Sequence, residues 1–260
     1  MAETTTQQWG TEPEMFGPRH EHRLAMILRE TEAFPANARV LDGAVGLGQL
    51  GARMRARGAR AFGIDVSLAA ALHATRAAGV PSIVGDMARL PFRDATFDGV
   101  TSGETLEHLE EDGTAAAEIA RVLRDGGTAV VTVPALRALW SKSDEFQEHK
   151  RRYERAELRA LFDGAGMKVA RASYWGFPVV LLYDLLFILP LNIARARSRV
   201  PRDEGPGGRR PPLHLARAAG RSSFLVRIVR ALFRIDSLFR WIPFGPGLIL
   251  VAKKGAPSGE

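Results

Sequence analysis

Between residues 38 and 134, short apolar runs alternate with stretches of helical character, and this alternation restricts the chain to a few folds. Apolar or β-branched runs, typical of buried strands, stand at 38–43, 59–65, 81–86, 95–102 and 128–134. Helical stretches stand at 50–58, 68–79 and 104–123. Strands that alternate with helices in this way pair in parallel, so the sequence predicts an α/β fold with a mostly parallel sheet.

After residue 134 the pattern changes. A helix is predicted at 156–166, a strand at 167–175 and a closing strand at 247–254, with a hydrophobic helical insertion before that last strand. The apolar segment 177–191 has 15 residues and carries Asp184, whereas a membrane-spanning helix needs about 20 apolar residues. We therefore expect a helix that is buried or lies at an interface.

The rest of the insertion is basic. Residues 195–212 are rich in Arg, Pro and Gly, which predicts a flexible loop. Between 222 and 241, Arg227, Arg230 and Arg234 recur at spacings of three and four among large apolar residues. This pattern predicts a basic amphipathic helix with a wide apolar face.

Charge is unevenly divided along the 260 residues. Residues 1–191 hold 22 Lys+Arg and 25 Asp+Glu, whereas 192–260 hold 14 and 4. A basic final quarter indicates an anionic partner, either a lipid headgroup, a phosphate or a nucleic acid, although solvated arginine-rich loops explain the charge equally well. The absence of cysteine excludes disulfides and Cys-ligated metals. The first residues lack the basic and apolar regions of a signal peptide, so we expect a cytoplasmic protein.

Polar residues stand where several predicted strands end. Asp42 ends the first strand and precedes Gly46 and Gly48, and glycines at such a turn let the backbone approach a ligand. Asp65 and Asp86 end the second and third strands, and Ser102-Gly103-Glu104 follow the fourth. Each acid alone is as well explained by a turn or a helix cap. Together they predict a shared ligand crevice at the carboxyl edge of the sheet.

These residues resemble the class I S-adenosylmethionine-dependent methyltransferases, in particular small-molecule enzymes with a type 11-like domain. VLDGAVGLGQLG (40–51) is similar to the cofactor-binding motif, GIDVS (63–67) to the ribose-binding strand end, and GDMARLPF (85–92) to the segment around adenine. FDGVTSGETLEHL (97–109) resembles the fourth-strand motif, and EFQEHKRRY (145–153) part of an acceptor-side segment. The resemblance implies a Rossmann-like, doubly wound sheet and S-adenosylmethionine as cofactor.

The resemblance also implies which residues hold the cofactor. They are Asp42, Gly43, Ala44, Gly46, Gly48, Asp65, Val66, Asp86, Met87, Ser102 and Gly103. The family usually writes its turn D-x-G-x-G-x-G, whereas here Ala44 occupies the first glycine position and adds a methyl group. The turn also lacks the G-x-G-x-x-G pattern of dinucleotide-binding enzymes, so a dinucleotide is the poorer interpretation.

Methyl transfer to a hydroxyl needs a proton acceptor, whereas a neutral amine needs none. His108, His149 and Glu104 are the candidate catalytic residues, although a structural role explains His108 as well. Trp140, Arg152 and Tyr153 are candidates for acceptor binding. No convergent carboxylates accompany His20 and His22, so no metal site is expected.

The sequence thus predicts four segments. Residues 1–37 form a helical lid or an ordinary packing helix, 38–175 the cofactor-binding core, 176–246 an insertion that forms an acceptor pocket or a membrane-facing surface, and 247–260 the closing strand and tail. The favoured function is methyl transfer to a hydroxyl, amine or carbon of a small hydrophobic or lipid-linked acceptor, with peripheral membrane contact through 222–241. A nucleic-acid methyltransferase and a non-catalytic scaffold are the alternatives. The sequence does not settle the oligomeric state.

Overall fold

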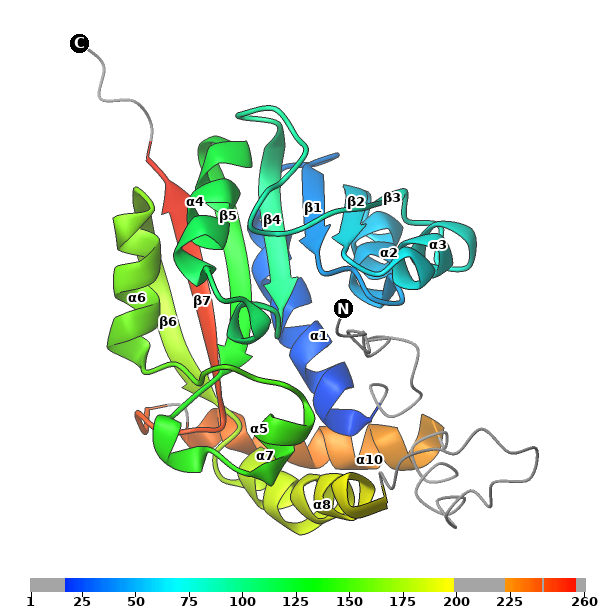
Figure 1. Ribbon diagram of the computed structural model, residues 1–260, viewed down its shortest axis with the longest axis vertical. Helices are drawn as coiled ribbons and strands as arrows, with labels where there is room; N and C mark the ends of the chain where they lie inside the picture. The colour runs from blue at the N-terminus through cyan, green and yellow to red at the C-terminus, as the bar shows by residue number, and fades with distance from the viewer. Residues whose placement is uncertain (1–16, 199–222, 240, 256–260) are drawn as a thin grey trace, which may run out of the picture.

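A computed structural model describes residues 17–198, 223–239 and 241–255 (Figure 1). Seven strands form one sheet in the order β3-β2-β1-β4-β5-β7-β6. The strands are β1 (Arg39–Gly43), β2 (Arg60–Asp65), β3 (Ser82–Val84), β4 (Phe97–Gly103), β5 (Leu123–Pro134), β6 (Met167–Trp175) and β7 (Gly247–Lys254). Neighbours among β1 to β5 pair in parallel, and only β7 runs antiparallel to its neighbours. The predicted mostly parallel α/β sheet is confirmed.

Alternate side chains of the strands enter two separate cores. On β1, Val40 joins one apolar cluster and Leu41 the other, and on β5 the same alternation separates Val130 from Val131. All four side chains are fully buried. Both faces of the sheet are therefore covered, as parallel strands require.

Helices cover the two faces. On one side lie α1 (Pro18–Glu30) and α2 (Gln49–Ala56), and on the other lie α4 (Asp112–Val122) and α6 (Arg155–Gly164) (Figure 1). A further helix, α3 (Leu68–Arg76), begins at Ser67, whose hydroxyl accepts the Ala70 N–H in a standard N-terminal cap. Short helical segments complete this part: η2 (Thr31–Ala33), η3 (Leu106–His108), η4 (Arg137–Leu139) and α5 (Lys142–Phe146).

The predicted helix at 104–123 is wrong at its start. Glu104 has a φ of 59°, which no helix interior accommodates, and α4 begins only at Asp112. The chain turns at Glu104 directly after β4. The short η3 follows this turn, and the continuous helix begins only with α4.

The insertion between β6 and β7 is helical. It contains α7 (Val179–Tyr183), the π-helical η5 (Asp184–Ile188), α8 (Leu189–Ser198), α10 (Ser223–Phe233) and η6 (Arg234–Phe239). The predicted loop at 195–212 is wrong for its first four residues, which belong to α8, and residues 199–212 lie outside the described part of the chain. Among the described residues, no helix combines the length and hydrophobicity needed to cross a bilayer.

One carboxylate joins the two halves of the insertion. Asp236 in η6 accepts hydrogen bonds from the backbone N–H groups of Val179 and Val180, at 2.7 and 3.1 Å. These N–H groups belong to the first turn of α7, where no helical partner is available for them. Phe233 is 1% exposed and packs edge-on against Tyr183 and His22, so α10 is seated against both α7 and α1.

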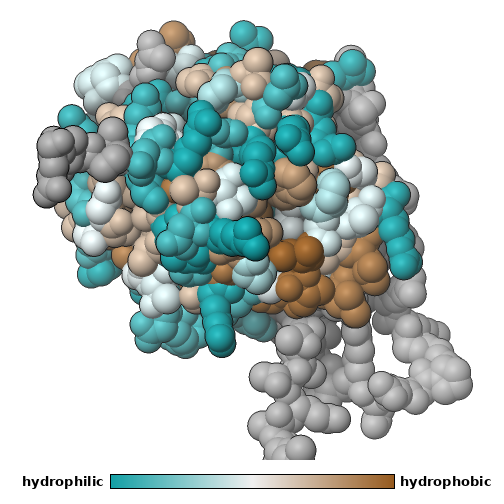
Figure 2. Space-filling view, turned by 90° about the horizontal axis from the view of Figure 1, so that it is seen from above, coloured by the Kyte–Doolittle hydropathy of each residue, from teal (hydrophilic) through white to brown (hydrophobic). Residues whose placement is uncertain are grey.

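Apolar side chains also remain at the surface. The face seen in Figure 2 is mostly hydrophilic, with hydrophobic side chains gathered toward its lower right. Several of the most exposed apolar residues belong to the insertion and its exit: Leu182, Leu185, Leu186, Phe187, Leu238 and Trp241, between 49% and 78% exposed. Surfaces that expose several large apolar side chains are typical of interaction sites.

Whether α1 belongs to the core is testable by removing its most buried side chain. Ile27 is fully buried in the cluster on the α1 side of the sheet, so Ile27→Ala should lower the free energy of unfolding by about 2–5 kcal/mol. Urea denaturation measures this difference. Arg29→Ala, an exposed change on the same helix, should stay within about 0.5 kcal/mol of the wild type. A cost for Ile27→Ala as small as that of Arg29→Ala would mean that α1 is loosely docked, as a lid is.

Candidate functional site

The turn between β1 and α2 has a backbone that favours glycine. Gly46 and Gly48 have φ values of +52° and +78°, in the left-handed region that side chains disfavour. A Cβ at Gly48 would lie 2.8 Å from the Cβ of Ala78, whereas one at Gly46 would meet no atom within 4 Å. Gly48 thus allows close packing, and Gly46 borders open space that a ligand can enter. Ala44 also has a positive φ, of +55°, and is exposed.

Asp65 fixes this turn. One of its carboxylate oxygens accepts the Gly46 N–H at 2.9 Å, and the other accepts the Ser67 N–H at 2.9 Å. Hydrogen bonds from N–H groups to a carboxylate are stronger than those between neutral groups. The end of β2 therefore holds the glycine turn of β1 in place.

Asp42, near the end of β1, also helps to hold the segment after this turn in place. It is 3% exposed, accepts the Gly51 N–H at 2.9 Å and receives a longer contact, 3.3 Å, from the Thr101 hydroxyl. Burial raises the pKa of Asp42 to about 7, because the two hydrogen bonds only partly offset the loss of solvent. Asp42 is therefore a carboxyl that changes charge near neutral pH.

A crevice lies between the glycine turn and α1, where the order of the strands reverses from β1 to β4. In open α/β sheets this position is where ligands bind. Its lining residues are His20, Arg23, Leu24, Ile27, Asp42, Ala44, Val45, Gly46, Leu47, Gln49, Leu50 and Gly103.

The other predicted cofactor residues are not among those that line this crevice. Met87 is buried, and a Cβ at Gly43 would lie 2.7 Å from its Sδ atom, so these two residues pack together. Asp86 accepts the Ala88 N–H, and Val66 is 69% exposed beside Asp65. Ser102 is fully buried, and its hydroxyl has no hydrogen-bond partner in the described structure. Their contacts with a cofactor stay predictions.

A buried charged cluster adjoins the crevice. Glu104 lies 3.3 Å from Arg23 and 3.5 Å from Arg19, both on α1, and Arg19 also donates to Asp184 of η5 at 3.0 Å. Burial opposes ionisation of Glu104, but the two arginines outweigh it and lower its pKa. These contacts join α1, the end of β4 and the insertion at one point.

His149 lies on the far side of Glu104 in a second set of contacts. Its Nδ1 atom is 2.9 Å from Asp144, and Arg152 donates to both oxygens of that carboxylate at 2.7 and 3.0 Å. Burial favours the neutral form of Asp144, but the bonds from His149 and Arg152 lower its pKa to about 2. Asp144 thus stays charged and fixes the orientation of the His149 ring.

His108 and Glu107 face His149. The ring centroids of the two histidines are 4.9 Å apart, and each Nε2 atom lies about 4 Å from the same oxygen of Glu107, at 3.9 Å for His108 and 4.0 Å for His149. Burial and the neighbouring His149 lower the pKa of His108 to about 4, so its imidazole is neutral at pH 7. The structure therefore brings together Glu104, His108 and His149, the three candidate catalytic residues.

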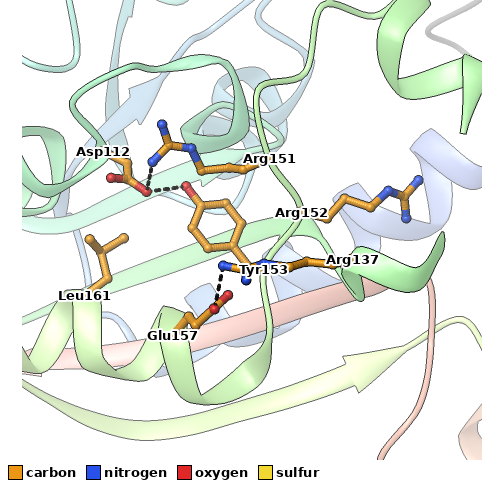
Figure 3. A pocket seen from close by; sticks show the side chains of 7 residues that line it. All are labelled: Asp112, Arg137, Arg151, Arg152, Tyr153, Glu157 and Leu161. Carbon is orange, nitrogen blue, oxygen red and sulfur yellow. Dashed lines mark hydrogen bonds and ion pairs between the residues drawn. The ribbon is translucent and has the colours of Figure 1, made fainter. Parts of the chain in front are cut away.

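The candidate acceptor-binding residues are not gathered in this way. Tyr153 lines a separate hollow on the α4 and α6 side, where its hydroxyl donates to Asp112 at 2.7 Å (Figure 3). Burial, with Asp112, raises its pKa. The guanidinium of Arg152 points away from the other side chains of that hollow, toward Asp144, and Trp140 is 41% exposed. Acceptor binding by these three residues stays a prediction.

Sequence reasoning missed several residues of the charged cluster. Arg19 and Arg23 recur four residues apart on one face of α1, and Asp184 is an isolated acid within an apolar run, so both signals were present. His20 and His22 do not share a site, because His20 bonds to Gln49 at 2.8 Å while His22 packs against Trp175 and Phe233.

Known proteins share this fold and these motifs. Residues 41–131 match the family model of a methyltransferase domain. A demethylmenaquinone methyltransferase of Mycobacterium sp. strain KMS is 40% identical over 93 residues, which cover 36% of this chain and 40% of that enzyme. The chain thus matches about two fifths of the length of this curated relative.

Solved structures resemble the chain over more of its length. One is a Haloferax volcanii putative methyltransferase in complex with the Trm112 methyltransferase activator, with a TM-score of 0.63, 22% identity and coverage of 97% of this chain and 96% of that one. Another is Haemonchus contortus phosphoethanolamine N-methyltransferase 2 with S-adenosyl-L-methionine, with a TM-score of 0.63, 16% identity and coverage of 98% and 59%. Residues 41–131 therefore match a methyltransferase domain, and the chain has the fold of these solved structures, in agreement with the predicted resemblance and fold.

The raised pKa of Asp42 gives a pH dependence that one substitution should remove. A carboxyl whose pKa is about 7 when folded and 3.8 when unfolded binds more protons in the folded state, so it lowers stability as pH rises from about 4 to 7. The slope reaches at most about 1.4 kcal/mol per pH unit. Asp42→Asn should therefore gain stability relative to the wild type between pH 5 and 8 in urea denaturation. Asp125→Asn, an exposed change near the start of β5, is the control, and a curve for Asp42→Asn that runs parallel to the wild type would contradict the assignment.

Proposed function

We propose that the protein transfers the methyl group of S-adenosylmethionine to a hydroxyl, amine or carbon of a small hydrophobic or lipid-linked acceptor. The observation that carries this proposal is the position of the crevice. It opens beside the glycine turn that Asp65 fixes, and Arg23 on its wall contacts Glu104 of the buried charged cluster. The space beside the glycine turn, which suits a cofactor, thus adjoins a polar region that suits an acceptor.

The residues that line the crevice would orient the cofactor and the acceptor and would exclude water from the reacting atoms. The bound cofactor supplies a methyl group on a sulfonium, which is already activated for transfer. Leu24 and Ile27 of α1 place apolar atoms on one wall, opposite the turn at Gly46. Correct alignment of donor and acceptor contributes about 7–11 kcal/mol in well-oriented reactions.

A hydroxyl acceptor must also lose a proton. The cluster of Glu104, His108 and His149 provides groups that can take it, since His108 is neutral at pH 7 and Asp144 orients the His149 ring. A positioned base accelerates such a step by about 10²–10⁴-fold. For an amine that arrives neutral, these groups orient the acceptor and no base is required.

Two observations favour a lipid-linked acceptor. The curated relative is named for demethylmenaquinone. The exposed apolar side chains around η5 and η6, among them Phe187, Leu238 and Trp241, would contact the bilayer that holds such an acceptor. Arg227 and Arg230 of α10 and Arg234 of η6 are exposed, and each cation near an anionic membrane surface adds about 1 kcal/mol.

The proposed reaction is tested by transfer of radiolabel from S-adenosylmethionine. We expect label in the organic phase with hydrophobic quinols or lipid-linked saccharides, and none with RNA or soluble amines. Asp65→Asn should bind S-adenosylhomocysteine about 10- to 100-fold more weakly, because it weakens charge-assisted bonds that fix the turn, and should lose transfer at limiting cofactor. Asp125→Asn is the matched control. Label in RNA alone would contradict the acceptor class, and unaltered binding by Asp65→Asn would contradict the cofactor site.

Membrane contact is tested separately by vesicle flotation. We expect the protein to float with vesicles of phosphatidylcholine and phosphatidylglycerol and less with phosphatidylcholine alone. A Leu238→Ser, Trp241→Ser double variant should lose flotation with both, and Arg234→Ala should lose only part of the anionic component. Leu72→Ser, a comparable change on α3, should float as the wild type does. Absence of the wild type from both floating fractions would contradict the proposed membrane contact.

A further inference from the structure

Glu107 is a buried carboxylate that has no hydrogen-bond partner for its side chain among the described residues. Its side chain is 0% exposed, and neither of its oxygens has a hydrogen-bond partner on another described residue. Burying an unpaired carboxylate costs several kcal/mol, so such groups normally carry a proton, meet a cation or bind a metal. The proposed methyl transfer assigns no role to Glu107.

Two imidazoles face this carboxylate. The Nε2 atoms of His108 and His149 lie 3.9 and 4.0 Å from the same Glu107 oxygen, too far for hydrogen bonds. The three potential ligand atoms, one from each residue, all lie within 4.8 Å of one another. Because Zn–N and Zn–O bonds are about 2.0–2.2 Å long and meet at tetrahedral angles, two atoms bound to one ion lie about 3.3–3.6 Å apart. Small side-chain shifts would therefore bring all three atoms onto a single ion.

The groups behind the imidazoles are those that orient metal ligands. The Nδ1 atom of His149 is bonded to Asp144, which Arg152 holds with two hydrogen bonds, and His108 is hydrogen-bonded to the backbone of Glu148. A carboxylate or carbonyl on the second ring nitrogen is typical of metal-bound histidine, because it fixes the tautomer that leaves the first nitrogen free to bind.

The backbone also fixes the distance between the two segments. The Lys150 N–H donates to the carbonyl of Glu107 at 2.8 Å, and the His149 N–H donates to the carbonyl of Asp144 at 3.0 Å. The segment that carries His149 is thereby attached directly to the segment that carries Glu107 and His108. The backbone bonds thus hold the two segments that carry the three side chains together.

We propose that Glu107, His108 and His149 bind one divalent transition metal ion of the zinc type. Two imidazoles and one carboxylate suit Zn²⁺, whereas Mg²⁺ prefers oxygen ligands alone. Three protein ligands leave a further position for water or an acceptor atom. The same nitrogen atoms either bind the ion or take a proton, so a binding measurement also decides between these two roles.

The test is zinc binding by the metal-stripped full chain, without cofactor or acceptor, in competition with a chromophoric chelator. The wild type should bind one Zn²⁺ per chain. Asp144→Asn should weaken binding about 10- to 100-fold, as loss of an orienting group does, while Glu107→Gln and His149→Gln should weaken it further. His73→Gln, at an exposed site on α3, and His20→Gln should bind as the wild type does.

A second readout does not depend on how the variants fold. The wild type loaded with Co²⁺ should show the visible absorption bands of a four- or five-coordinate ion, and Zn²⁺ should abolish them. Absence of these bands together with absence of zinc binding by the wild type would overturn the proposal, as would equal zinc affinity in Glu107→Gln and the wild type. Either result would leave methyl transfer untouched, because that activity is measured by label transfer.

Discussion

The reversal of strand order between β1 and β4 is the constraint on which the site depends. The connections that follow these two neighbouring strands run in opposite directions, so a crevice opens between them beyond their carboxyl ends. The glycine turn narrows that space from one side, and α1 closes it from the other. A ligand crevice is therefore a consequence of the topology, and the residues around it determine what the crevice can hold.

Buried charge then determines how the crevice is closed. Glu104 would be costly to bury alone, and the two arginines that neutralise it come from α1, outside the sheet. One of them, Arg19, also reaches Asp184 in the insertion. Helix α1, the residue that follows β4 and the insertion are thus joined through a single ion-paired group. Pairs of this kind contribute little net stability, but separating one partner from the others is costly, which favours one arrangement of the three elements.

The sequence predicted the sheet and the glycine turn because their signals are local. Asp42, Gly46 and Asp65 lie within 24 residues, and each strand has its own apolar run. The break at Glu104 was missed because the positive φ stands at a residue that is not itself a glycine. Glu107, which faces His149, was also missed, because it is 42 residues away in the sequence and is brought close by contacts between the two segments, among them the bond from the Lys150 N–H to the Glu107 carbonyl. Local patterns therefore predict the sheet and its glycine turn far better than the contacts between segments that are distant in the sequence.

The point where the insertion joins the sheet has a consequence for how such proteins can diverge. The last residue of β6, Trp175, is directly paired with the first residue of β7, Gly247, and the Trp175 ring occupies the space that a Cβ at Gly247 would need. The insertion thus begins and ends at two residues that are paired with each other in the sheet. Because the entropy of closing a loop grows only slowly with its length, insertions of very different size can join these two residues at little cost to the sheet. The insertion can therefore change in length and sequence while the seven-stranded sheet is retained.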